Sequence, residues 1–268
     1  MNIFDMTNRI GNSDSIRLYE EMTKMQIGDI LLFGSYYLPG TADPNDARVK
    51  CPIDWQVIDK SADRIMLLSR HSLFWTFYDG RTPLWGPPPK TSWEKSTIRE
   101  ELNNECLESW FSISEQSLII EHVQAMDENP VFRTLSGDNT IDRLFLLSLD
   151  EANRYLGVNR NYTKDPKLRK NSEACTCMIM ADFVMNKERC REIELFPDFA
   201  PWWLRTSGMD AQHIICINED GSADFEGMES SADEVGIRPA MWIDLSRLQT
   251  DEENELPYGE GDDDLPFC

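Results

Sequence analysis

Residues 201–208 of the chain read Pro-Trp-Trp-Leu-Arg-Thr-Ser-Gly, residues 214–222 read Ile-Ile-Cys-Ile-Asn-Glu-Asp-Gly-Ser, and residues 235–243 read Val-Gly-Ile-Arg-Pro-Ala-Met-Trp-Ile. Short runs rich in aromatic and β-branched residues are typical of strands. An Asp-Gly pair between two such runs is a strong signal for a tight hairpin turn. The three stretches therefore predict a Trp-rich strand, a hairpin that turns at Asp220-Gly221, and a closing strand.

Further strands and helices are predicted upstream of these stretches. The expected strands are 28–34, 53–59, 64–69, 121–125, 143–147, 212–217, 222–226 and 237–243. Three Ser/Thr-x-x-Glu capping boxes predict helix starts: Thr97 with Glu100, Ser112 with Glu115, and Ser148 with Glu151.

The first of these helices repeats apolar residues at i+4, and the third is expected to end at Gly157. The residues expected on the buried face of the first helix are Ile98, Leu102, Cys106 and Trp110. Strands and helices do not alternate regularly, so the predicted fold class is α+β with short, mostly antiparallel strands.

The chain is strongly acidic, with 48 acidic and 26 basic side chains among 268 residues and a formal charge of −22. Eight acids lie within residues 251–264, and removing these from −22 leaves −14 on the rest. We expect an N-terminal helical extension over residues 1–26, one domain over 27–245, and an acidic disordered tail over 246–268.

This charge argues against a nucleic-acid partner, because it repels the phosphate backbone. We expect no membrane span, since no run approaches 18 apolar residues. Seven cysteines without framework spacing suit reduced thiols. A cytoplasmic location is expected, and export with a partner stays open.

The ordered motifs resemble a bacterial family of domains of unknown function, whose members carry Trp-Trp-Leu-Arg and Arg-Pro-Ala-Leu-Trp-Ile segments. The resemblance spans about residues 27–245 and also involves residues 28–36, 52–57, 93–103 and 145–152. The closing region is similar to that of C-type-lectin-like folds, including the formylglycine-generating-enzyme type. The resemblance implies a single C-type-lectin-like domain, although a shared fold does not determine function.

The tryptophans and arginines of the decisive stretches have two interpretations. Trp202, Trp203 and Trp242 are a candidate sugar-stacking platform, but packing in the core is favoured for aromatic residues on strands. Arg205 and Arg238 interrupt apolar strands, so we expect structural roles in buried pairs with carboxylates such as Asp54 rather than an exposed anion site.

No metal, cofactor or catalytic residue is assigned. Oxygen donors gather around one turn (Asn218, Asp220, Asp224 and Glu226), but without the terminal Glu of an EF-hand loop, so a plain hairpin is favoured over a calcium site. Cys175, Cys177 and Cys190 are a candidate zinc set or redox pair, and buried thiols are favoured.

The expected function is non-enzymatic recognition of a protein or glycan ligand through the last hairpin and its flanking loops. An oxidising enzyme of formylglycine-generating type that uses a cysteine pair, and a structural or assembly protein, are the alternatives. The candidate ligand-binding residues are Met209, Asp210, Gln212, Glu226, Met228, Glu229, Ser230 and Asp233.

Overall fold

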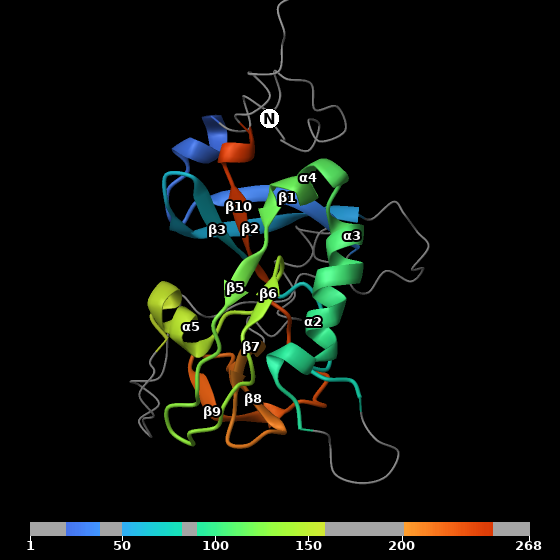
Figure 1. Cartoon of the computed structure of the whole chain (residues 1–268), viewed down its shortest axis with the longest axis vertical. Coiled ribbons are helices and arrows are strands. Elements are labelled where there is room, and N and C mark those ends of the chain that lie inside the picture. Colours follow the sequence, from blue (N-terminus) through green and yellow to red (C-terminus); the bar gives the residue numbers. More distant parts are fainter. Residues whose placement is uncertain (1–19, 38–49, 82–89, 159–200, 249–268) are drawn as a thin grey trace, which may run out of the picture.

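The computed structural model describes residues 20–37, 50–81, 90–158 and 201–248 (Figure 1). Helices and antiparallel sheets are both present, which confirms the α+β class. Most of the expected acidic tail, most of the N-terminal extension and the three cysteines Cys175, Cys177 and Cys190 lie outside these residues.

A five-stranded antiparallel sheet occupies one half of the molecule (Figure 1). Its strands, in spatial order, are β1 (Ile30–Tyr37), β2 (Lys50–Lys60), β3 (Arg64–Ser69), β10 (Ala240–Asp244) and β4 (Ile119–Ile120). The closing strand β10 thus returns to the interior of the sheet, between β3 and β4, where Trp242 pairs with Met66. The four consecutive residues 65–68 of β3 are all buried, as expected for a strand covered on both faces.

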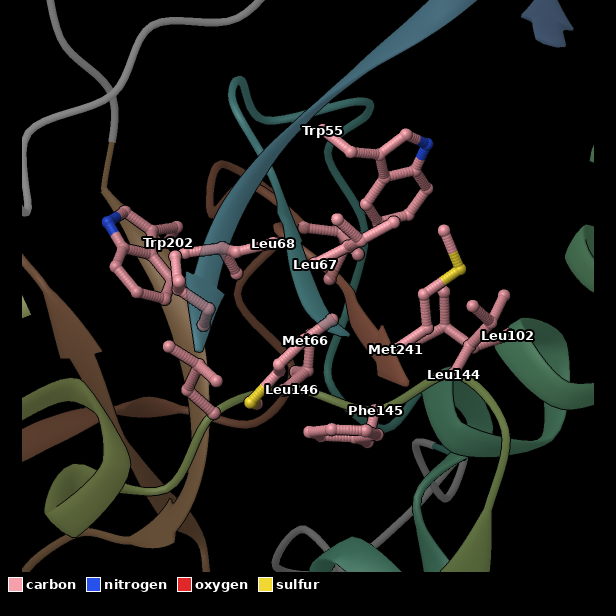
Figure 2. Packing of buried hydrophobic residues seen from close by; sticks show 14 of the residues in the cluster. Trp55, Met66, Leu67, Leu68, Leu102, Leu144, Phe145, Leu146, Trp202 and Met241 are labelled. Atoms are coloured by element: carbon pink, nitrogen blue, oxygen red, sulfur yellow. The ribbon is translucent and has the colours of Figure 1, made fainter. Parts of the chain in front are cut away.

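A helical segment packs against this sheet and consists of η3 (Trp93–Lys95), α2 (Thr97–Glu101), a π-helical turn η4 (Leu102–Cys106), α3 (Leu107–Trp110) and α4 (Ile113–Leu118). The predicted apolar face is buried along its whole length, and Figure 2 shows Leu102 close to Met241 of β10.

Two of the three predicted capping boxes are confirmed, at Ser112 with Glu115 and at Ser148 with Glu151. The first prediction is wrong by one residue, because Ser96 and not Thr97 caps α2 by accepting from the Arg99 amide. The Thr97 hydroxyl instead accepts from the backbone N–H of Gly80. Either of the two adjacent hydroxyls could cap the helix, but the one of Thr97 is already bonded to Gly80, which lies in a separate loop.

The other half of the molecule contains a three-stranded sheet, β7 (Trp202–Ser207), β8 (His213–Ile217) and β9 (Ala223–Glu229), and helix α5 (Leu149–Leu156). Helix α5 ends at Gly157 in the left-handed conformation, as predicted. The two-stranded ribbon β5 (His122–Gln124) and β6 (Thr140–Asp142) lies between the halves (Figure 1), and η5 (Ser246–Leu248) follows β10.

The strand expected at 143–147 does not form. Phe145 forms an isolated bridge with Ala240 of β10 through reciprocal backbone hydrogen bonds of 3.0 and 2.7 Å, and the Leu147 carbonyl accepts from the Arg205 amide of β7. Residues 144–147 are all buried nevertheless, and Figure 2 shows them crossing beneath the central strands. The apolar run therefore indicated burial correctly and secondary structure incorrectly.

The end of the N-terminal extension packs on the first sheet. Residues 20–24 are helical, and Met22 is fully buried. The Lys60 ammonium donates to the carbonyls of Thr23 and Met25 at the end of this helix, where a positive charge is favoured.

Candidate functional site

The tryptophans of the decisive stretches are buried. Trp202 and Trp203 have no exposed surface and Trp242 is nearly covered. The Trp203 indole donates to the Thr76 carbonyl at 3.1 Å, and the Arg238 guanidinium lies 5.2 Å from the centre of the Trp202 ring. In these positions the three rings cannot stack on a sugar.

Arg205 is the central polar residue of the second half, and its side chain is 2% exposed. Its guanidinium donates to both carboxylate oxygens of Glu151, at 2.5 and 3.0 Å, and to the carbonyls of Leu146 and Ala125. Arg205 therefore forms the expected buried pair with a carboxylate, and this carboxylate belongs to Glu151 rather than to Asp54. Glu151 also accepts from the Ser148 amide, so one carboxylate caps α5 and fixes it to β7.

A loop over residues 128–136 lies beside the second sheet and is held there by Asn129, which is fully buried. The Asn129 amide donates to the carbonyls of Ser207 and Phe225, at 3.1 and 2.8 Å. Its carbonyl oxygen accepts from the backbone amides of Val131 and Phe132. One side chain thus joins the loop to both β7 and β9.

Two more contacts bring this loop to the turn that follows β7. The Thr134 hydroxyl donates to the Met209 carbonyl at 3.1 Å, and the Ser207 hydroxyl donates to the Leu135 carbonyl at 3.3 Å. Met209 in turn donates its backbone N–H to the Glu226 carbonyl of β9. The loop, the turn and β9 therefore form one surface.

Large apolar side chains on this surface face solvent. Val131, Phe132 and Met209 are each 40% exposed and Leu135 is 76% exposed, although hydrogen bonds hold their backbones in place. We call these four residues the apolar patch. The bonds of Thr134 to Met209 and of Ser207 to Leu135 bring the loop and the turn together, and exposed apolar surface on such ordered segments is typical of interaction sites.

Of the predicted ligand-binding residues, Met209 belongs to this patch and Glu226 is bonded to it through the backbone, whereas Met228 is partly buried against the core. Asp210 follows Met209 and accepts from the imidazole of His213 at 2.7 Å, which helps to hold the pKa of Asp210 below its usual range. The Gln212 carbonyl accepts from the Ser230 amide. The strand pairs His213–Glu229 and Ile214–Met228 place Glu229 and Met228 on β9.

Two predicted residues fit less well. Ser230 is buried, so it cannot contact a ligand directly, and Asp233 lies beyond β9 in the segment that leads to Val235. Val131, Phe132 and Leu135 were not predicted from the sequence. Their signal was a Pro130 turn followed by two adjacent apolar residues inside an otherwise polar connection.

Acidic side chains surround the apolar patch. Glu128, Glu226 and Glu229 are exposed and Asp210 is half-buried. Arg133, on the same loop, pairs with Glu128 at 2.5 Å. The surface thus combines an apolar centre with an acidic margin.

The turn between β8 and β9, where the oxygen donors gather, is held by hydrogen bonds among its own residues. Asp220 accepts from the amide and hydroxyl of Ser222, and Gly221 has positive φ, so the predicted turn is present. Within the ranges that the structure describes, no group of three or more His, Cys, Asp or Glu side chains could hold a metal ion. Burial raises the pKa of the thiols of Cys106 and Cys216, which disfavours their thiolates.

No helix in the described part of the chain combines the length and hydrophobicity needed to cross a membrane.

A family model described as a domain of unknown function (DUF6273) matches residues 62–245 of the chain. The match begins after β1 and β2, which nevertheless belong to the same five-stranded sheet as the matched strand β3. No curated protein and no solved structure matches the chain.

Proposed function

The chain belongs to the DUF6273 family, and we propose that it is a recognition module that binds a protein partner through the apolar patch and the adjoining hairpin β8–β9. The observation that carries this proposal is the exposure of four large apolar side chains on backbone that buried hydrogen bonds hold in place. Because the backbone is already ordered, binding through this surface costs the immobilisation of the side chains and not the ordering of a loop.

The arrangement of the surface supports a protein ligand rather than a glycan. Protein interfaces typically have an apolar centre and a polar margin. The exposed fractions of Phe132 and Leu135 suit insertion into a complementary apolar pocket, whereas the tryptophans that could have stacked on sugars are buried. The acidic margin favours a partner with a basic surface.

We further propose that the domain has a C-type-lectin-like architecture. The C-type-lectin-like resemblance is supported by an antiparallel sheet that contains both β1 and β10, and by a second antiparallel sheet formed by β7, β8 and β9. In the resembling binding proteins, the displayed residues lie between the corresponding motifs. A cytoplasmic location is likewise proposed, on the spacing of the cysteines.

The test is capture of a partner from an extract of the source cell with the wild type and with the double variant Phe132→Asp/Leu135→Asp. The matched control is Ile113→Asp, because Ile113 is 88% exposed at the start of α4, outside the patch. We expect a specific partner whose recovery falls at least tenfold with the double variant and is unchanged with the control. Equal recovery with all three proteins would contradict the proposal, provided that thermal unfolding shows each variant to be folded.

A further inference from the structure

A second group of exposed aromatic side chains lies on the extended segment 73–79. Trp75 is 46% exposed and Phe77 is 40% exposed. Their neighbours point inward: the Phe74 ring lies 6.0 Å from the ring of Trp110, and the Tyr78 ring lies 5.6 Å from that of Trp203. Exposure alternates over residues 74–78, as it does where side chains point to opposite sides in turn, so we place Trp75 and Phe77 on the same side. We call them the aromatic pair.

The backbone that carries the aromatic pair is held by hydrogen bonds to the segment that follows β9. Leu73 donates to the Ile237 carbonyl, Thr76 donates to the Val235 carbonyl, and Asp79 donates to the Ser230 carbonyl. Trp75 itself forms an antiparallel bridge with Gly236. The backbone that carries both residues is therefore fixed by the fold.

The segment opposite the aromatic pair is acidic. Phe77 lies between the hydrogen bonds that reach Val235 and Ser230, and the intervening residues include Asp233 and Glu234, both exposed. Residues 230–236 contain no Lys or Arg. On the other side, Arg81 donates to both carboxylate oxygens of Asp79, at 2.8 and 3.0 Å, so its charge is compensated.

Aromatic faces beside carboxylates favour a cation. The face of an aromatic ring is electrically negative and attracts a guanidinium or ammonium group, and a carboxylate accepts hydrogen bonds from the same group. Guanidinium combines both contacts, because it stacks flat on a ring and donates in its plane.

We propose that the aromatic pair, with Asp233 and Glu234, binds arginine side chains of a basic peptide. This site lies on a different segment from the apolar patch and recognises a different chemistry, so it goes beyond the function proposed above. This proposal gives a role to the rings of Trp75 and Phe77, which belong neither to the hydrophobic core nor to the apolar patch.

The test is titration of the full chain with hexa-arginine amide, followed through the indole N–H resonance of Trp75, which is assigned by comparison with Trp75→Phe. Hexa-citrulline amide, which has nearly the same shape without the charge, is the matched ligand control. We expect the Trp75 resonance to shift with the arginine peptide only. No shift, or an equal shift with the citrulline peptide, would overturn the proposal.

Affinity measurements separate this site from general attraction to an acidic protein. A cation–π contact at an exposed site corresponds to about a two- to fivefold change in affinity per ring, so Trp75→Leu/Phe77→Leu should weaken hexa-arginine binding roughly tenfold. Glu234→Gln should weaken it further, whereas Glu105→Gln, an exposed acid on η4, should not. Equal affinities for the wild type and the double variant would show general electrostatic attraction only. Hexa-arginine binding tests this site even if no partner for the apolar patch exists.

Discussion

Removal of the Glu151 carboxylate should strongly destabilise the protein, and Glu151→Ala is the perturbation that tests this. The variant leaves the Arg205 guanidinium, 2% exposed, without its ionic partner. It also removes the acceptor for the Ser148 amide at the start of α5.

The expected cost is about 3 kcal/mol. Breaking a buried ion pair from one side costs about 3–5 kcal/mol, because a charge is left uncompensated. The side chain of Glu151 is 24% exposed, which places the ionic part at or below the lower end of that range. The two carbonyls that still accept from Arg205 reduce the loss, and the lost hydrogen bond from the Ser148 amide adds about 1 kcal/mol.

The assay is urea unfolding at pH 7, with the free energy of unfolding taken from the midpoint and slope. Asp150→Ala is the matched control, since this exposed neighbour lies in the same helical turn and should cost less than 1 kcal/mol. Replacing both Glu151 and Arg205 with Met should restore much of the loss, because no buried charge then remains. A loss below 1 kcal/mol for Glu151→Ala would refute the role assigned to this pair.

Three further predictions concern other parts of the fold. Gly34→Ala should cost at least 2 kcal/mol more than Gly28→Ala in urea unfolding. Both glycines have positive φ, but a Cβ at Gly34 would lie 2.5 Å from the Phe111 ring, whereas a Cβ at Gly28 would have nothing within 4 Å. Equal costs would show that Phe111 does not pack against Gly34 as described. Burial lowers the pKa of His71 to about 4, so the unfolded chain takes up a proton as the pH falls from about 6.5 to 4 while the folded chain does not. Over this pH range the wild type should therefore lose about 2 kcal/mol more stability than His71→Gln. Parallel profiles of stability against pH for the two proteins would show that His71 is not held neutral by burial. Asn129→Ala should cost about 2–3 kcal/mol by urea unfolding, because it leaves buried carbonyls of β7 and β9 without their donor, and a loss under 0.5 kcal/mol would show that the loop is not held as described.

Local patterns in the sequence predicted much of the fold. The capping boxes at Ser112 and Ser148, the left-handed end at Gly157 and the apolar face of the first helix each depend on residues within a few positions of one another. Such interactions can be read from spacing alone. The choice of Ser96 over Thr97 could not, because it depends on the backbone of Gly80, in a separate loop.

The candidate site was predicted only in part, for the same physical reason. The sequence indicated the last hairpin, but the apolar patch exists because Asn129 joins its loop to strands 78 and 96 residues away. Glu151 was recognisable as a helix cap, whereas its ion pair with Arg205, 54 residues along the chain, was not. Contacts at such separations are set by how the elements pack, which no local pattern records.

The most direct test of the proposed recognition function is photo-crosslinking from single positions in the source cell. A photoreactive phenylalanine analogue is placed at Leu135 or Phe132 in the apolar patch, or at Ile113 as a control that is also highly exposed. We predict that both patch positions crosslink to the same protein and that position 113 does not. Crosslinking to that protein from all three positions, or no crosslinked protein from either patch position, would contradict recognition through this surface.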